Sequence, residues 1–130
     1  MTKRVLLVED DPSISFMVME VLRHEGFEVV SASDGYRALE ILRGNYFDAA
    51  VLDIMLPGLD GISILRTIRN DPSHASMSIV MVTAKVDDET TWAGWKAGCD
   101  YYLPKPFDPD ELVSILNRVG SDSTSAGRGR

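Results

Sequence analysis

Short apolar runs alternate with amphipathic segments along most of the chain. Runs of strand length occur at about 4–9, 28–32, 48–53, 78–83 and 100–103. The first, third and fourth are continuously apolar, as in "VLLV", "AAVL" and "SIVMV", and such runs are typical of strands that are buried on both faces of a sheet. Because strands that alternate with helical segments indicate a parallel sheet covered by helices, the pattern predicts an α/β domain.

A helical segment follows each of the five apolar runs. Asp11 can cap the first helix, Pro12 suits its first position, and Gly26 ends it. Apolar residues three and four positions apart predict further helices at about 35–43, 61–69 and 87–97 and from Pro109 onward. Five βα units fit a flavodoxin-like doubly wound fold, with a five-stranded parallel sheet in the strand order 2-1-3-4-5.

Length and composition limit the chain to one domain with a hydrophobic core. Of its 130 residues, 45% are hydrophobic and 25% are charged, which is typical of a globular domain. No apolar run approaches the ~20 residues that span a bilayer, and the N-terminus lacks a signal-peptide core. We therefore expect a cytoplasmic protein without membrane contact. Residues 120–130 lack large apolar side chains and are expected to form a disordered tail or a truncated linker after a domain at 1–119.

Charge, motifs and reactive residue types exclude several functions. The net charge of −7 argues against nucleic-acid binding by this domain, because phosphate contacts need clusters of Lys and Arg. Neither GxGxxG nor a P-loop motif occurs, which disfavours nucleotide binding. Cys99 is the single cysteine and is expected to be a small buried residue. His24 and His74 lie among polar neighbours, so both are expected at the surface.

Polar residues follow the ends of four predicted strands. They are Glu9, Asp10 and Asp11 after the first, Asp53 at the end of the third, Thr83 at the end of the fourth and Lys105 after the fifth. Ligands of doubly wound sheets bind beyond these carboxyl ends. Adjacent carboxylates repel each other unless a cation holds them. The pattern therefore predicts a hard divalent cation, with Mg²⁺ favoured because it combines few carboxylates with waters and phosphoryl oxygens.

A set of short motifs carries a family resemblance. The motifs are Asp10-Asp11, Asp53 in "VLDIMLPGLDG", Thr83-Ala84 after "IVMV", and Lys105 in "DYYLPKPF". In this order and spacing they resemble the receiver domain of two-component response regulators. The resemblance covers about residues 3–119, and it is the set of motifs, rather than any one of them, that is specific.

The resemblance implies a phosphoacceptor beside a metal ion. Asp53 would accept a phosphoryl group from a histidine kinase or a histidine phosphotransfer protein. Asp11, Asp53 and the backbone carbonyl of Met55 would bind Mg²⁺ directly. Asp10 would hold the ion through water, and Glu9 is expected to be a peripheral charge. A carboxylate beside Mg²⁺ and a lysine is shielded from the charge of the incoming phosphoryl group, as such a transfer requires.

The resemblance also implies a set of switch residues. Lys105 would pair first with the phosphoacceptor and then with a phosphoryl oxygen, and Thr83 would bond another phosphoryl oxygen. Tyr102 is similar to an aromatic residue that changes rotamer as Thr83 moves, although Tyr101 beside it could take the surface position. The Lys105-Pro106 bond matches a position where the family has a cis peptide bond.

The predicted function is a signalling switch and not an enzyme. Phosphorylation would shift an equilibrium between two surface states, and the chain would catalyse only its own phosphoryl transfer and autodephosphorylation. The surface formed by the fourth helix, the fifth strand and the fifth helix is expected to contact partners or form a homodimer. Trp92 is the interface candidate on this surface, whereas Trp95 is expected in the core.

The chain departs from the family pattern at two positions, and the sequence leaves two alternative functions open. Met55 and Lys85 stand where the family flanks the path of the hydrolytic water, and they predict a long-lived phosphoryl group. One alternative is a phosphohydrolase with Asp53 as nucleophile, although Met55 then stands in the place of the acid. The other is a pseudo-receiver that binds partners without phosphorylation.

Overall fold

The computed structural model describes residues 3–84 and 87–122. The prediction for Lys85 lies outside these residues. The last helix continues to Asp122 and so extends past the predicted domain boundary at residue 119. The remainder of the predicted tail, 123–130, lies outside the described residues.

Five parallel strands form one sheet in the order β2-β1-β3-β4-β5, which confirms the predicted fold and strand order. The elements in chain order are β1 (Arg4–Val8), α1 (Pro12–His24), β2 (Glu28–Ala32), α2 (Gly35–Leu42), β3 (Ala49–Asp53), α3 (Gly61–Asn70), β4 (Ser78–Thr83), α4 (Asp88–Ala97), β5 (Tyr101–Pro104) and α5 (Pro109–Asp122). Within the described ranges, no helix combines the length and the apolarity needed to span a bilayer.

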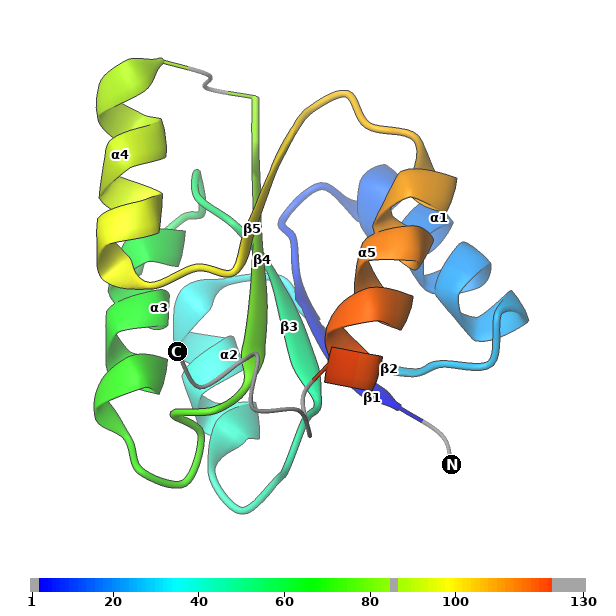
Figure 1. Ribbon diagram of the computed structural model, residues 1–130, viewed down its shortest axis with the longest axis horizontal. Helices are drawn as coiled ribbons and strands as arrows, with labels where there is room; N and C mark the ends of the chain where they lie inside the picture. Colours follow the sequence, from blue (N-terminus) through cyan, green and yellow to red (C-terminus); the bar gives the residue numbers. More distant parts are fainter. Residues whose placement is uncertain (1–2, 85–86, 123–130) are drawn as a thin grey trace.

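The sheet is the middle layer of three. Helices α1 and α5 cover one face, and α2, α3 and α4 cover the other (Figure 1). Successive residues of a strand point to opposite faces, so Val5 and Leu7 pack with α1 and α5, whereas Leu6 and Val8 pack with α2 and α3. Each fully buried aliphatic side chain of these clusters contributes about 1.5–3 kcal/mol of transfer free energy. The two hydrophobic clusters fix the strand register that sets the strand ends.

Aspartates begin the first four helices. Asp11, Asp34, Asp60 and Asp87 each accept a hydrogen bond from a backbone N–H of the helix that follows. Such a cap stabilises a helix by about 1 kcal/mol. Because each of these helices follows a strand, all four caps lie at the edge of the sheet where the strands end.

Helix α4 contacts the sheet through small residues. Gly94 is the buried residue of α4, and a Cβ atom on it would lie 3.6 Å from the ring of Tyr102. The helix therefore lies close to β5, and its tryptophans remain at the surface. Trp92 is 67% exposed, as expected, but Trp95 is 46% exposed, and its predicted place in the core is wrong.

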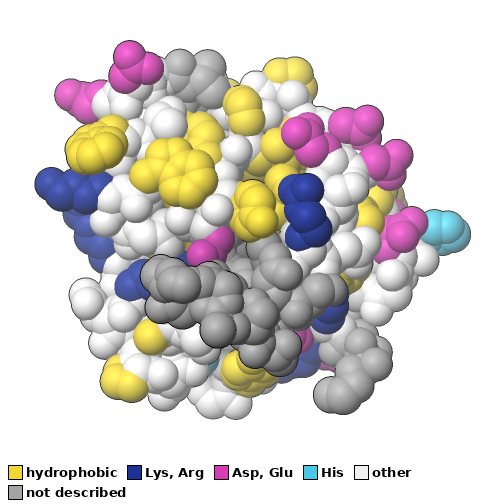
Figure 2. Space-filling view, viewed as in Figure 1, with side chains coloured by type: hydrophobic (Ala, Val, Ile, Leu, Met, Phe, Trp, Pro, Cys, Tyr) yellow, Lys and Arg dark blue, Asp and Glu magenta, His cyan; other side chains and the backbone are white. Residues whose placement is uncertain are grey.

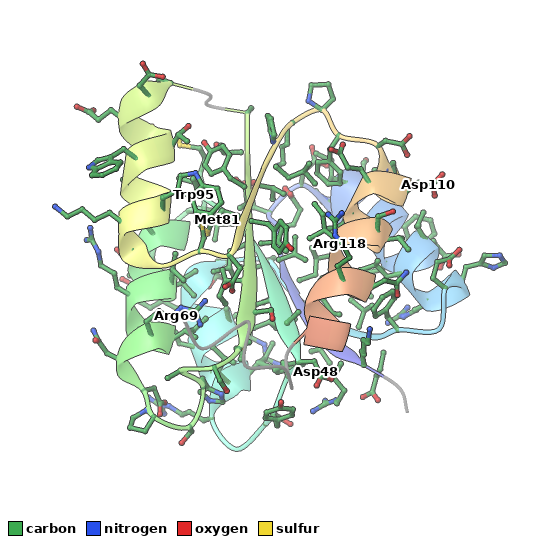
Figure 3. The ribbon with its side chains drawn as sticks, viewed as in Figure 1. Asp48, Arg69, Met81, Trp95, Asp110 and Arg118 are labelled. Atoms are coloured by element: carbon green, nitrogen blue, oxygen red, sulfur yellow. The ribbon has the colours of Figure 1, made fainter. Side chains whose placement is uncertain are left out.

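Arg69 of α3 ties the other end of α4 to the sheet (Figure 3). Its guanidinium donates to Gly98 O at 3.0 Å, to Met77 O at 2.6 Å and to Asp100 Oδ2 at 2.9 Å. The guanidinium also donates to Ala75 O at 2.9 Å, so this one side chain joins the segment before β4 to the segment between α4 and β5. This arrangement fixes where α4 ends and β5 begins.

The remaining reactive residues have structural surroundings. Cys99 is buried as predicted, and burial, followed by the charge of Asp100, raises the pKa of its thiol to about 12. The thiol therefore stays protonated and inert at neutral pH. His24 is exposed, as expected. The surface prediction for His74 is wrong, because it is half-buried with Nε2 3.0 Å from Leu42 O.

Candidate functional site

Lys105 joins two carboxylates that come from distant parts of the chain. Its Nζ lies 2.8 Å from Glu9 Oε1, 96 positions away, and 2.8 Å from Asp53 Oδ2, 52 positions away. Glu9 follows β1, Asp53 ends β3, and Lys105 follows β5. The predicted convergence of acidic residues and a lysine at the strand ends is therefore present.

Asp53 is held in a fixed orientation. Its side chain is 5% exposed; Oδ2 contacts Lys105, and Oδ1 accepts a hydrogen bond from Met55 N at 2.9 Å. The first residue of α3, Gly61, packs directly on the backbone carbonyl of Asp53, where a Cβ atom would overlap the oxygen. The carboxylate is thus buried, oriented and next to a positive charge.

Glu9 is part of the site, and the prediction of a peripheral charge is wrong. It is 3% exposed. Glu9 N donates to Ala32 O at 3.1 Å, which continues the β1–β2 ladder for one more residue and turns the side chain inward. Oε1 contacts Lys105, and Oε2 accepts a hydrogen bond from Asp11 N at 3.1 Å.

The acidic cluster consists of Glu9, Asp10 and Asp53, which each offer one carboxylate oxygen within 4.8 Å of the other two. Asp11, expected as a direct metal ligand, is not part of it. Asp11 is exposed, and its Oδ1 caps α1 by accepting from Ser13 N at 2.8 Å and Ile14 N at 3.3 Å. The structure therefore shifts the predicted acidic pair by one residue, from Asp10 and Asp11 to Glu9 and Asp10.

Burial and charge act on the ionisation of Glu9 and Lys105. Burial raises the pKa of the Glu9 carboxyl, although the hydrogen bond from Lys105 opposes this effect. Burial by itself would lower the pKa of the Lys105 ammonium, but hydrogen bonds and attraction from Asp53 and Glu9 together raise it. Lys105 therefore carries its positive charge throughout the neutral pH range.

The two switch candidates lie on adjacent strands. Thr83 is fully buried at the end of β4, next to the end of β3, and its backbone oxygen accepts from Lys105 N at 2.8 Å. Tyr102 of β5 is half-buried and packs with the cluster on the α4 side, whereas Tyr101 packs with the cluster on the α5 side. The Lys105-Pro106 peptide bond is cis, as the resemblance implied.

A small apolar groove lies beside Lys105. It has a volume of about 240 Å³ and is lined by Ile14, Met17, Ala84, Lys105, Pro106 and Phe107. The groove lies between α1 and the connection from β5 to α5, next to the buried carboxylates.

The site has the donors that a hard divalent cation requires. Mg²⁺ binds through one or two carboxylates and keeps several waters. Within the described residues, Asp10 makes no hydrogen bond or ion pair, so its oxygens are available. Glu9 and Asp53 supply further carboxylate oxygens within the same cluster. The donor set of this chain therefore fits a divalent metal.

Comparison with known proteins identifies the family. Residues 5–117 match the family model described as "Response regulator receiver domain". The DNA-binding response regulator MtrA of Mycolicibacterium smegmatis is 44% identical over 114 residues, which are 88% of this chain and 49% of MtrA. The chain thus spans about half the length of the curated relatives it matches.

Solved structures agree with the family model. The receiver domain of the Francisella response regulator 1452 has a TM-score of 0.88 and 32% identity, with 95% of this chain and 100% of that chain covered. The receiver domain of the sensor histidine kinase PA1611 from Pseudomonas aeruginosa PAO1 has a TM-score of 0.86 and 33% identity, with 93% and 99% covered. The chain belongs to the response regulator receiver domain family, whose standard role is phosphorylation and signal switching. Receiver domains bind a divalent metal at an acidic pocket and interact with histidine kinases.

Proposed function

We propose that Asp53 of this chain accepts a phosphoryl group from a histidine kinase or a histidine phosphotransfer protein. An oxygen of Asp53 attacks phosphorus, the P–N bond to the donor imidazole breaks, and the imidazole retains the electron pair and takes up a proton. The observation that carries the proposal is the Lys105 ammonium 2.8 Å from Asp53 Oδ2. This charge offsets the repulsion between the carboxylate and the incoming phosphoryl group.

Mg²⁺ is the proposed metal, held by Asp10, Asp53 and the backbone carbonyl of Met55. Glu9 belongs to the same acidic cluster and is proposed to contact the ion through water. When bound, the ion supplies positive charge that screens the phosphoryl oxygens. The solved receiver domain of PA1611 has a magnesium ion in its active site cleft.

Lys105, Thr83 and Tyr102 are proposed to convert phosphorylation into a surface change. Lys105 would move from Asp53 Oδ2 to a phosphoryl oxygen, while Thr83 bonds a second one. A shift of Thr83 toward the phosphoryl group would open space beside Tyr102, which contacts α4. Autodephosphorylation, by water attack on the acyl phosphate, is proposed to return the chain to its first state and to be slow, as Met55 and Lys85 suggest.

A mass measurement tests this function. After incubation with Mg²⁺ and a small acyl-phosphate donor, the intact chain is expected to gain one phosphoryl group. The gain should disappear when EDTA removes the metal, because the charge of the phosphoryl group then lacks a counterion. The absence of any adduct in the presence of Mg²⁺ would favour the pseudo-receiver alternative.

The surface of α4, β5 and α5 is proposed as the partner and homodimer interface. Hydrophobic side chains gather on the α4 and β5 side of the molecule (Figure 2). The two tryptophans of α4, Trp92 and Trp95, are exposed. Aromatic residues are enriched in the few interface positions that carry most of the binding free energy. Trp92 is the best candidate for such a position, since two-thirds of its surface is free.

Trp92→Ala is expected to weaken dimerisation of the phosphorylated chain by about 2 kcal/mol. Sedimentation velocity over a concentration series measures the dissociation constant. Phe16→Ala is the matched control, because Phe16 is 67% exposed, the same fraction as Trp92, but lies on α1. Equal dimerisation of the two variants would contradict the role of Trp92.

The output of the full protein is proposed from the relatives. MtrA is named a DNA-binding response regulator, and CseB of Streptomyces avermitilis is named a transcriptional regulatory protein. This chain covers 49% and 51% of their lengths, so we propose that it controls a separate DNA-binding effector domain in the cytoplasm. The acidic chain itself, with a net charge of −7, is not proposed to contact DNA.

A further inference from the structure

The first turn of α2 lies in direct contact with the loop between β3 and α3. Gly35 is the first residue of α2, and a Cβ atom on it would overlap Leu59 O and lie 2.8 Å from Leu59 Cβ. The helix can approach the loop this closely only because Gly35 has no side chain. The N-cap, Asp34, accepts a hydrogen bond from Arg37 N at 2.8 Å and fixes where the helix begins.

Tyr36 packs on the same loop one residue earlier, at Gly58. A Cβ atom on Gly58 would lie 2.9 Å from Tyr36 Cε2 and 3.1 Å from Tyr36 Cδ2, and Gly58 has a φ of +76°. The rest of the Tyr36 ring is largely free, since the residue is 65% exposed. Within the described part of the chain its hydroxyl makes no hydrogen bond. The Cδ2–Cε2 edge of the ring is thus the part of Tyr36 that lies against Gly58.

The start of this loop is held by the phosphoacceptor and by α3. Met55 N donates to Asp53 Oδ1 at 2.9 Å, and Gly61 N donates to Ile54 O at 3.1 Å. The tip of the loop touches α2, because Gly58 lies against Tyr36 and Leu59 lies against Gly35. The Met55 carbonyl lies between these two parts, in the peptide unit whose N–H, Leu56 N, donates to Ile54 O at 3.2 Å.

We propose that Tyr36 is a positioning residue for the metal site. Its ring would hold the tip of the loop and thereby limit the positions that the Met55 carbonyl can take when the metal binds. Met55 is the ligand that depends most on the loop, because the other proposed ligands are side chains at strand ends. This inference rests on the proposed Mg²⁺ site and adds to it a residue of α2, outside the acidic cluster.

The test compares Mg²⁺ affinity, measured by calorimetric titration, in single-tyrosine variants. Tyr36→Ala is expected to weaken Mg²⁺ binding about tenfold, the usual effect of losing a group that orients a metal ligand. Tyr36→Phe keeps the ring and should bind as the unmodified chain does. Tyr46→Ala is the matched control, since Tyr46 is 61% exposed and its side chain lies outside the site.

Thermal unfolding in EDTA separates positioning from general destabilisation. Tyr36→Ala and Tyr46→Ala should lower the midpoint by similar small amounts, because both remove a largely exposed ring. Only Tyr36→Ala should lose part of the further rise in midpoint that Mg²⁺ produces, since that rise depends on metal affinity.

A second pair of variants tests the contact between α2 and the loop by substituting glycines. Gly35→Ala is expected to weaken Mg²⁺ binding, because the methyl group displaces Leu59 and the loop. Gly44→Ala strains a residue with φ of +76° but meets no atom within 4 Å, so it should lower stability and leave Mg²⁺ affinity unchanged.

The Mg²⁺ titrations distinguish a failure of the proposed metal site from a failure of the positioning role of Tyr36. If the unmodified chain fails to bind Mg²⁺, the proposed metal site is overturned and the inference with it. If the unmodified chain binds Mg²⁺ and Tyr36→Ala binds as tightly as Tyr46→Ala, only the positioning role is overturned. Weak binding by Tyr36→Phe would place the effect in the hydroxyl group and would also contradict the ring contact.

Discussion

Asp53→Asn is expected to abolish phosphorylation by a small acyl-phosphate donor in the presence of Mg²⁺. The amide lacks the negatively charged oxygen that attacks phosphorus. Lys105 Nζ keeps its contact with Glu9 at 2.8 Å, so the variant should remain folded. Intact mass after incubation with the donor checks the result.

Asp110→Asn is the control for this loss. Asp110 is an exposed carboxylate at the start of α5, and its substitution removes one negative charge without touching the strand ends (Figure 3). The Asp110→Asn chain should gain one phosphoryl group as the unmodified chain does. An adduct on the Asp53→Asn chain would show that another group accepts the phosphoryl group.

The second large expected effect is a loss of Mg²⁺ affinity when Asp10 is substituted. Asp10→Asn is expected to weaken Mg²⁺ binding about 100-fold, or by about 2.7 kcal/mol, because it removes a charged ligand from the acidic cluster. Asp11→Asn removes the same charge one residue later, but asparagine is as good a helix N-cap as aspartate. Its Mg²⁺ affinity should therefore change little. Calorimetric titration with Mg²⁺ compares the two variants directly.

The opposite result would reverse the assignment of the acidic residues. Weak Mg²⁺ binding by Asp11→Asn, with near-normal binding by Asp10→Asn, would support the order implied by the sequence motifs alone. In that case Asp11 would have to leave the cap of α1 when the ion binds. Circular dichroism of the metal-loaded chain would then report a loss of helix.

The fold could be predicted from the sequence because the same local signals, apolar runs and helix caps, recur along the chain. Each predicted strand lies within one residue of the observed bounds, since continuous apolar runs between polar segments mark buried parallel strands. Helix starts were also readable where an aspartate precedes the helix, as Asp11 does before α1. These local signals agree with one another, which is the condition for a unique fold.

The acidic cluster was harder to predict because three carboxylates follow one another. Which of Glu9, Asp10 and Asp11 point into the site depends on where the β1 ladder ends. One further ladder bond, from Glu9 N to Ala32 O, decides this. A shift of one residue exchanges an inward side chain for an outward one. Local patterns fix strand ends only to within a residue or two, which is enough for a fold but not for a ligand.

Trp95 was misplaced for a different reason. Large aromatic residues usually bury most of their surface, but the buried face of α4 is formed by Gly94 and not by a large side chain. How closely a helix approaches its sheet depends on both partners, here Gly94 and Tyr102. The composition of the helix alone does not contain that information.

The contact between Glu9 and Lys105 joins positions 96 residues apart. During synthesis, Asp53 leaves the ribosome well before Lys105, so an incomplete chain contains the phosphoacceptor without its neighbouring ammonium group. Closing so long a segment costs entropy that only the finished sheet offsets. We therefore expect a copy that lacks Lys105, or in which the sheet is not closed, to accept phosphoryl groups poorly.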